Sequence, residues 1–199
     1  MQCLYRGVMW RKADDRKVVC LTFDDGPIPE VTPHILAILR EKNVKATFFL
    51  VGDNVQKYPD LYRAILADGH RVGNHTFHHI KGWRTSIRTY LDDVEQCRRV
   101  LGVSAGEDLL MRPPYGRIRT SQKLALLRRG YKLVLWDVLT HDYNKNYSVE
   151  QMLDVVKRYT RNGSVIVFHD SLKSGERMLQ ALPLVIEYLQ AEGYDFVKI

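Results

Sequence analysis

The chain has 199 residues, of which 45% are hydrophobic and 27% are charged, and its formal net charge at neutral pH is +7. This length and composition predict one globular domain with its own hydrophobic core, and they exclude a disordered chain or a disulfide-dependent scaffold. The three cysteines, Cys3, Cys20 and Cys97, are widely separated and odd in number, so we expect free thiols.

The basic charge would attract polyanions, but the Lys and Arg residues are scattered and no nucleic-acid-binding motif accompanies them. We therefore expect no nucleic-acid partner. No segment reaches the ~20 apolar residues of a membrane span, and the first residues lack the apolar core of a signal peptide. We expect a monomer without a membrane span, cytoplasmic as supplied, or extracytoplasmic if a leader has been trimmed.

Short apolar runs alternate with amphipathic stretches of helical period from residue 17 to residue 199, which is typical of βα units around a parallel sheet. In chain order we expect a strand at 18–23, a helix at 32–42, a strand at 46–51, a helix at 59–69, a strand at 70–74, a helix at 85–101, a strand at 109–111, a helix at 120–130, a strand at 131–138, a helix at 148–160, a strand at 164–168, a helix from 176 and a strand at 194–198. Residues 1–16 are expected to form an N-terminal extension to the domain at 17–199.

Capping residues indicate where several of these helices begin. Thr32 precedes a proline and is the expected N-cap of the first helix. Either Thr85 or Ser86 is expected to cap the third helix, and the fourth is expected to be capped at residue 120 or 121. Ser148 and Gln151 have the spacing of a capping box.

Unusual polar residues follow the ends of five expected strands. In chain order they are Asp24 and Asp25, His75, Arg112, Asp142, and His169. Because parallel strands all point the same way, residues that follow different strands meet on one face of the fold. The pattern therefore predicts one functional site.

His75 and His79 are four residues apart, so on a helical turn their imidazoles would face the same side. With Asp25 they would give the three nitrogen and oxygen ligands of a catalytic zinc site. The histidine pair alone is weak evidence, because core and surface histidines are common. His78 is expected to be an additional imidazole at the surface or behind the ligands.

The segment from Asp24 to Pro27 also has a purely structural interpretation, since Asp-Gly and Gly-Pro are common in turns. That interpretation does not explain why two adjacent acids leave a buried strand. Buried carboxylates are costly unless a cation or an arginine meets them, so these acids favour a functional site.

Five segments stand out in order along the chain: Thr22-Phe23-Asp24-Asp25-Gly26-Pro27, His75-Thr76-Phe77-His78-His79, Arg112-Pro113-Pro114-Tyr115-Gly116, Trp136 to Asp142, and His169-Asp170. Together they resemble the polysaccharide deacetylases of carbohydrate esterase family 4, also called the NodB homology domain. The resemblance covers about residues 18–198 and implies a distorted (β/α) barrel of seven or eight strands. It also implies a metal-dependent hydrolase that removes N-acetyl, sometimes O-acetyl, groups from chitin-like glycans or peptidoglycan, and makes residues 17–199 its catalytic domain.

The resemblance also implies a role for each matching residue. Asp25, His75 and His79 would bind a divalent metal, with zinc expected first and cobalt, nickel or manganese as alternatives. Asp24 would be the general base, paired with Arg112, and His169 the general acid, paired with Asp142. The backbone N–H of Tyr115 would help to stabilise the oxyanion. These groups meet the needs of amide hydrolysis: an activated water, a polarised carbonyl and a proton for the departing amine.

Some positions depart from the family pattern or have weaker support. Tyr143 stands where the family usually has Trp, and Leu139 where many members have Asp. Val167 is expected to line the pocket for the acetyl methyl group. Trp83 and Trp136 could flank a sugar ring, although core packing is equally plausible for both.

Two other functions remain open from the sequence. The chain could be a catalytically inactive homologue that binds glycans, for which the altered segment around Tyr143 is the only support. It could instead be an amidohydrolase that acts on a non-sugar amide, because the same residues serve any small acyl amide. The expected partner under the leading interpretation is an acetylated glycan.

Overall fold

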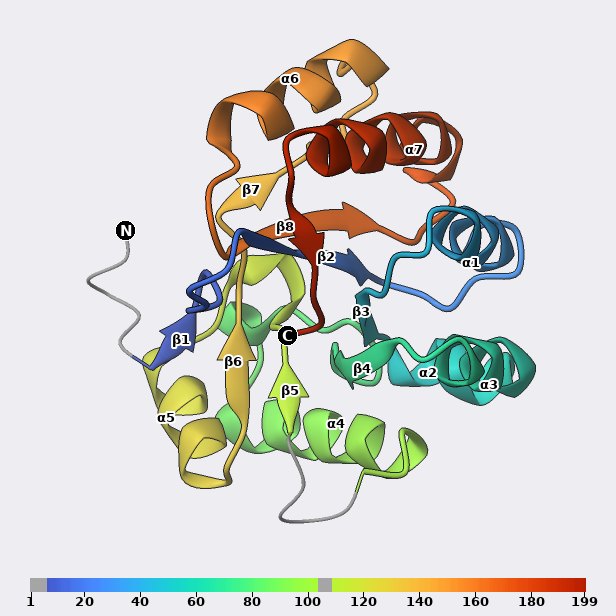
Figure 1. The fold of residues 1–199 in the computed structure, drawn as a ribbon. Coiled ribbons are helices and arrows are strands. Elements are labelled where there is room, and N and C mark those ends of the chain that lie inside the picture. Colours follow the sequence, from blue (N-terminus) through green and yellow to red (C-terminus); the bar gives the residue numbers. More distant parts are fainter. Residues whose placement is uncertain (1–6, 104–108) are drawn as a thin grey trace.

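The computed structural model describes residues 7–103 and 109–199. The described strands form one sheet in the order β1-β6-β5-β4-β3-β2-β8-β7, and β9 pairs with β2 outside this path (Figure 1). Their bounds are β1 Val8–Met9, β2 Val18–Asp24, β3 Thr47–Leu50, β4 Arg71–Asn74, β5 Leu110–Met111, β6 Lys132–Val134, β7 Val138–Leu139, β8 Ser164–His169 and β9 Asp195–Phe196. All ladders between these strands are parallel.

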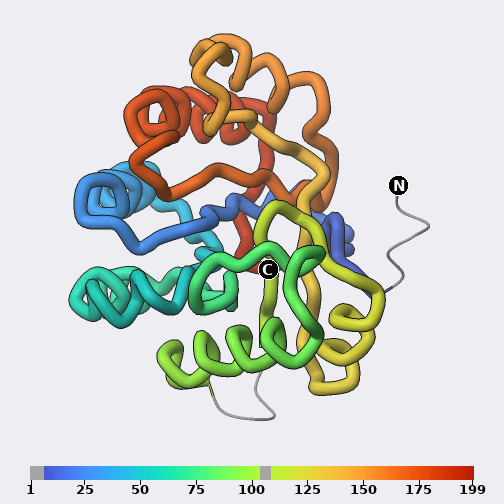
Figure 2. Tube along the Cα trace, turned by 180° about the vertical axis from the view of Figure 1, so that it is seen from behind, coloured from blue at the N-terminus to red at the C-terminus, as the bar shows by residue number. Residues whose placement is uncertain are grey.

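Helices surround the curled sheet and cover its outer face (Figures 1 and 2). They are α1 Thr32–Glu41, α2 Gly52–Lys57, α3 Pro59–Ala67, α4 Ile87–Val100, α5 Thr120–Arg128, α6 Val149–Tyr159 and α7 Gly175–Ala191, with short 3₁₀ turns at Gly82–Arg84 and Pro114–Gly116. The described strands β1 and β7 end the path and do not pair with each other. The prediction of a distorted (β/α) barrel is confirmed.

Strand β2 lies near the middle of the sheet, and all seven of its residues are buried. Successive side chains of a strand point to opposite faces, so Phe23 packs outward among the helices while Cys20, Thr22 and Asp24 point inward. The Phe23 ring stacks on Phe48 with a centroid distance of 5.0 Å. The same alternation that builds the core therefore brings Asp24 to the inner face at the carboxyl end of the strand.

The prediction of one strand at 131–138 is wrong, because this segment forms β6 and β7 in different parts of the sheet. The Leu135 N–H donates to the Met9 carbonyl at 2.8 Å, whereas the Asp137 N–H donates to the Val165 carbonyl at 3.2 Å. The segment thus passes from one end of the sheet to the other. A local apolar pattern carries no information about such a change of partner.

Two elements were not expected from the sequence. Strand β1 comes from residues assigned to the N-terminal extension and pairs with β6, although residues 1–6 lie outside the described part of the chain. Helix α2 begins directly after β3 and has only six residues. Both elements are too short for a clear hydrophobic period.

The capping predictions have mixed outcomes. Ser86 caps α4, since its Oγ accepts a hydrogen bond from the Thr89 N–H at 3.1 Å, and the predicted capping box of α6 is present. Thr32 does not cap α1: the N-cap is Val31, and the Thr32 hydroxyl donates to Asp170 Oδ2 at 2.6 Å. The cap predicted at residue 120 or 121 is also wrong, because Arg119 occupies the N-cap of α5.

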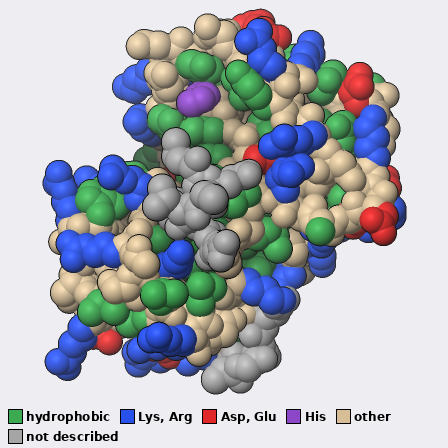
Figure 3. All heavy atoms as spheres, turned by 90° about the vertical axis from the view of Figure 1, so that its left-hand side faces the viewer, with side chains coloured by type: hydrophobic (Ala, Val, Ile, Leu, Met, Phe, Trp, Pro, Cys, Tyr) green, Lys and Arg blue, Asp and Glu red, His purple; other side chains and the backbone are tan. Residues whose placement is uncertain are grey.

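No helix in residues 7–103 or 109–199 is long and apolar enough to cross a membrane. Cys20 and Cys97 are free and buried, whereas Cys3 lies outside the described residues. On the face drawn in Figure 3, Lys and Arg side chains form several separate groups among other residue types.

Candidate active site

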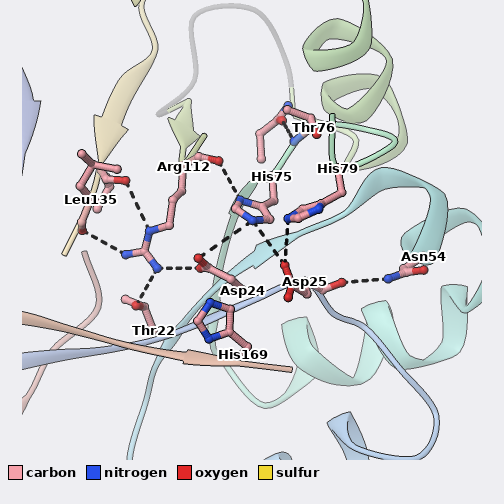
Figure 4. Close-up of polar contacts among 12 residues, drawn as sticks. Thr22, Asp24, Asp25, Asn54, His75, Thr76, His79, Arg112, Leu135 and His169 are labelled. Carbon is pink, nitrogen blue, oxygen red and sulfur yellow. Dashed lines mark hydrogen bonds and ion pairs between the residues drawn. The ribbon is translucent and has the colours of Figure 1, made fainter. Parts of the chain in front are cut away.

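The polar residues that follow different strands converge on one pocket of about 500 Å³ (Figure 4). Its lining residues are Asp24, Asp25, His75, His79, Tyr115, Trp136, Leu139, Tyr143, His169, Ser171 and Lys173. Arg112 and Asp142 are fully buried and contact lining residues from behind. The predicted convergence at the carboxyl ends of the strands is therefore confirmed.

Asp24 is held by the guanidinium of Arg112, which is itself completely buried. Arg112 Nη1 donates to Asp24 Oδ1 at 2.6 Å and to Thr22 Oγ1 at 2.8 Å. Burial lowers the pKa of Arg112 below its ordinary value and the Asp24 carboxylate offsets part of this effect, so the guanidinium stays charged. Because Oδ1 is occupied, the Asp24 Oδ2 atom is the oxygen that is left for a reactant in the pocket.

Asp25 faces both histidines of the predicted ligand set. Its Oδ1 lies 3.5 Å from His75 Nε2 and 3.3 Å from His79 Nε2, and one ligand atom from each residue falls within 4.8 Å of the others. The Oδ1 atom is buried but has no hydrogen-bond partner. Burial by itself would raise the pKa of Asp25. The neighbouring imidazoles of His75 and His79 lower it by more, so the pKa lies well below its ordinary value.

An unsatisfied buried carboxylate oxygen between two imidazole nitrogens fits a cation. The Nδ1 atom of His75 lies 2.7 Å from the Arg112 carbonyl oxygen, which can only accept, so Nδ1 carries the hydrogen. In the neutral ring the lone pair is then on Nε2, the atom that faces Asp25. These residues therefore fit a divalent metal ion with two nitrogen ligands and one oxygen ligand.

The segment that carries the two histidines is a loop, so the helical turn expected for it is wrong. Thr76 and His79 have positive φ angles of 65° and 53°. Asp93 of α4 provides hydrogen-bond acceptors for this loop. Its Oδ1 accepts from the N–H groups of Phe77 and His78 at 2.7 and 3.1 Å, and its Oδ2 lies 2.6 Å from His78 Nδ1. Thus His78 pairs with an acid behind the ligands, and Asp93 is a site residue that sequence reasoning missed.

His169 lies beside Asp24 on the neighbouring strand β8 and is paired with Asp142. Its Nδ1 lies 2.7 Å from Asp142 Oδ1, and its backbone N–H donates to Oδ2 at 2.6 Å. Burial alone would lower the pKa of His169, but the Asp142 carboxylate raises it to about 9. The imidazole is consequently protonated at neutral pH, with Nδ1–H engaged and Nε2–H available.

Asp170 packs against Gly26, which lies in the turn that follows β2 and Asp25. A Cβ atom on Gly26 would lie 2.0 Å from Asp170 Oδ2, so only glycine fits at this position. Burial raises the pKa of Asp170 to about 7, although the Thr32 hydroxyl lowers it in part. Asp170 therefore contributes to the shape of the turn that places Asp25.

The structure brings most, but not all, of the other predicted residues to the pocket. Tyr115 and Trp136 line it, whereas Val167 is fully buried in β8 and is absent from the lining. Trp83 packs edge-on against Tyr115 at 5.4 Å and does not line the pocket. Tyr143, at the position usually occupied by Trp, places its ring edge-on to His169 at 5.3 Å.

Ser171 and Lys173 also line the pocket and were not expected from the sequence. They lie two and four residues after His169, the last residue of β8. Their place in the loop between β8 and α7 was the only available sequence signal, and it does not distinguish them from other loop residues.

Comparison with known proteins gives a consistent result. Residues 11–134 match the family described as polysaccharide deacetylase. A peptidoglycan-N-acetylglucosamine deacetylase of Bacillus cereus is 31% identical over 195 residues, which cover 96% of this chain and 91% of that protein. The crystal structure of a peptidoglycan N-acetylglucosamine deacetylase, in complex with 4-naphthalen-1-yl-N-oxidanyl-benzamide, is 33% identical with a TM-score of 0.91, covering 97% of this chain and 91% of that one.

A further solved structure is described as a mutant of a CE4 family pseudoenzyme with restored enzymatic activity. It is 28% identical, has a TM-score of 0.84, and covers 96% of this chain and 68% of that one. Since one fold can hold both active and inactive proteins, the site residues decide whether a member of this fold is active.

Proposed function

The chain belongs to the polysaccharide deacetylase family and is a hydrolase that acts on acetylated glycans, and we propose that it removes N-acetyl groups from the amino sugars of a peptidoglycan-type glycan. Two similar proteins, both peptidoglycan N-acetylglucosamine deacetylases, favour this substrate. The observation that carries the proposal is that two hydrogen-bonded pairs, Asp24 with Arg112 and His169 with Asp142, lie in the same pocket as three residues that could bind a metal ion.

We propose that Asp25, His75 and His79 hold the metal ion, and that the ion is zinc. Two imidazoles and one carboxylate are a common set of protein ligands for catalytic zinc, while cobalt, nickel and manganese are alternatives that use similar donors. When bound, such an ion supplies Lewis-acid polarisation of the acetyl carbonyl and of a water molecule.

Asp24 is proposed as the general base. Its Oδ1 is held by Arg112, while Oδ2 lies 4.0 Å from His75 Nε2, which is one of the proposed ligand atoms. Arg112 stabilises the ionised form of the carboxylate and fixes its orientation, so that Oδ2 is directed at a water molecule beside the ligands. In this arrangement Asp24 removes a proton from the attacking water.

His169 is proposed as the general acid. An amine leaves an amide only when its nitrogen is protonated, and the pKa of about 9 keeps His169 protonated at neutral pH. Asp142 fixes the ring through Nδ1 and leaves Nε2–H to donate the proton. Asp24 Oδ2 and His169 Nε2–H are thus the two atoms that remain available for proton transfer.

The Tyr115 backbone is proposed to stabilise the oxyanion. Tyr115 has a positive φ of 60°, and its N–H donates to no acceptor within the described part of the chain. A free N–H on a residue that lines the pocket is suited to the negative charge that develops on the carbonyl oxygen during hydrolysis. Trp136, Tyr143 and Leu139 form the apolar wall of the pocket and are proposed to contact the sugar and its acetyl methyl group.

Acetate release tests this proposal. The protein, loaded separately with zinc, cobalt or nickel, is incubated with peptidoglycan glycan strands, chitooligosaccharides and acetylated non-sugar amides. We expect metal-dependent acetate release from the glycans, and loss of at least about 100-fold in kcat/KM with Asp24→Asn. Asp53→Asn, which changes an exposed acid paired with Lys57, is the matched control.

Two results would contradict the proposal. If the metal-loaded protein binds glycans but releases no acetate from any of them, and Asp24→Asn binds equally well, the protein is a glycan-binding homologue. If it acts only on the non-sugar amides, it is an amidohydrolase of another substrate class.

A further inference from the structure

A groove of about 720 Å³ adjoins the active-site pocket, and the two share Lys173 as a lining residue. The groove lies between the loop after β7 and the start of α7. Its lining residues are Lys145, Leu172, Lys173, Glu176, Arg177 and Gln180. A ligand that fills the pocket can therefore extend directly into this groove past Lys173.

The groove is basic, with three cationic residues and one acidic residue. Across residues 7–103 and 109–199, neither Lys145, Lys173 nor Arg177 forms an ion pair with a carboxylate. The Lys173 ammonium instead lies 5.6 Å from the centroid of the Tyr143 ring, at the edge of the pocket. The pocket's own acids cannot neutralise this charge, because Asp24 is paired with Arg112 and Asp25 faces the histidines.

Arg177 gives the groove a fixed wall. Its Nη1 donates to the Lys145 carbonyl at 2.7 Å and its Nη2 to the Asp142 carbonyl at 3.2 Å, so the guanidinium ties the loop after β7 to α7. Its Nε–H is buried and has no hydrogen-bond acceptor. Leu172, with 68% of its surface exposed, adds an apolar contact surface to the same groove.

We propose that this groove binds a carboxylate-bearing substituent of the glycan, carried by a sugar next to the one that loses its acetyl group. The inference rests on the proposed function and adds a charge requirement to it. Unpaired Lys and Arg side chains attract and orient an anionic group, while Leu172 contacts the adjoining apolar part of the substituent. The residues that bind the carboxylate would thus be separate from the residues that hydrolyse the amide.

The test compares two forms of one oligosaccharide. A tetrasaccharide of alternating N-acetylglucosamine and N-acetylmuramic acid carries free carboxylates, and converting these to methylamides removes the charge while keeping the shape. We expect the metal-loaded enzyme to have a kcat/KM about three- to tenfold higher for the charged form at low salt, with the difference decreasing at about 0.5 M salt. Equal kcat/KM values for the two forms would overturn the inference while leaving the proposed function intact.

Lysine variants connect the preference to the groove. Lys145→Met and Lys173→Met are each expected to lower the charged-to-neutral ratio about two- to fivefold. Lys157→Met is the matched control, because Lys157 is also exposed and lies 5.5 Å from a tyrosine ring but lines neither the groove nor the pocket. An unchanged ratio in both groove variants would refute the assignment of the charge requirement to this groove.

Calorimetric binding of the two tetrasaccharides separates this inference from the proposed function. Tighter binding of the charged form that is lost in Lys145→Met supports the groove even if no acetate is released, a result that would contradict only the proposed function. A glycerol phosphate oligomer serves as a second probe. If it displaces the charged tetrasaccharide at a lower concentration than a free carboxylated sugar does, the groove binds phosphate and the carboxylate assignment is wrong.

Discussion

Replacing Asp142 with asparagine is expected to shift the alkaline limit of activity toward neutral pH. The carboxylate lies 2.7 Å from His169 Nδ1 and is fully buried, so its charge acts on the imidazole with little screening by solvent. Asparagine keeps the size of the side chain but removes that charge. Burial, which lowers the pKa of His169, would then be opposed only by the charges of Asp25 and Asp24, so the pKa should return to about its ordinary value of 6.5.

The size of the effect follows from the pKa. The rise from 6.5 to about 9 is equivalent to about 3.4 kcal/mol, at about 1.36 kcal/mol for each pH unit. At pH 8 a group with a pKa of about 9 is ~90% protonated, whereas one with a pKa of 6.5 is ~3% protonated. The variant should therefore lose about 30-fold in kcat/KM at pH 8 and less than about twofold at pH 6 from protonation alone.

The assay is kcat/KM for acetate release measured between about pH 5.5 and pH 10, with the metal content of each sample determined. Asp154→Asn, which changes an exposed acid on α6, is the control and should follow the parent profile. A variant profile that is lowered by the same factor at every pH would refute the reasoning, because Asp142 would then orient His169 without setting its protonation.

Three further predictions concern metal binding and stability. Asp93→Ala should weaken metal affinity about tenfold by releasing the loop of the two histidines, whereas Asp92→Ala on the same helix should not; calorimetry that gives equal affinities would contradict this. His79→Gln should bind less than one metal ion per chain after dialysis, and full retention by elemental analysis would exclude His79 as a ligand. Burial lowers the pKa of His70 to about 4, so the unfolded chain binds the proton more tightly between pH 6.5 and pH 4. The free energy of unfolding in urea should fall by up to about 3 kcal/mol as the pH decreases through that range, and His70→Asn should remove this component; an identical pH dependence in the variant would contradict it.

The sequence by itself predicted the elements whose pattern is local and long enough to be distinct. The buried strand at 18–23, the helix with its cap at residue 85 or 86 and the capping box of α6 all follow from side-chain period or capping chemistry. The sequence also predicted that Asp24, Arg112 and other polar residues would meet, because each follows a strand of a parallel sheet. A parallel sheet places the ends of its strands side by side, so residues that are distant in the sequence can be predicted to be neighbours before any contact between them is known.

Only the tertiary structure decided features that depend on non-local partners. The segment 131–138 divides into two strands because Leu135 and Asp137 pair with opposite ends of the sheet. His75 and His79 face Asp25 from a loop satisfied by Asp93, not from a helix. The basic groove arises where Lys145, Lys173 and Arg177 are brought together from two segments. A single sequence encodes which chemical groups are present and roughly where each strand ends, but the distances and unpaired charges between segments exist only once the chain has folded.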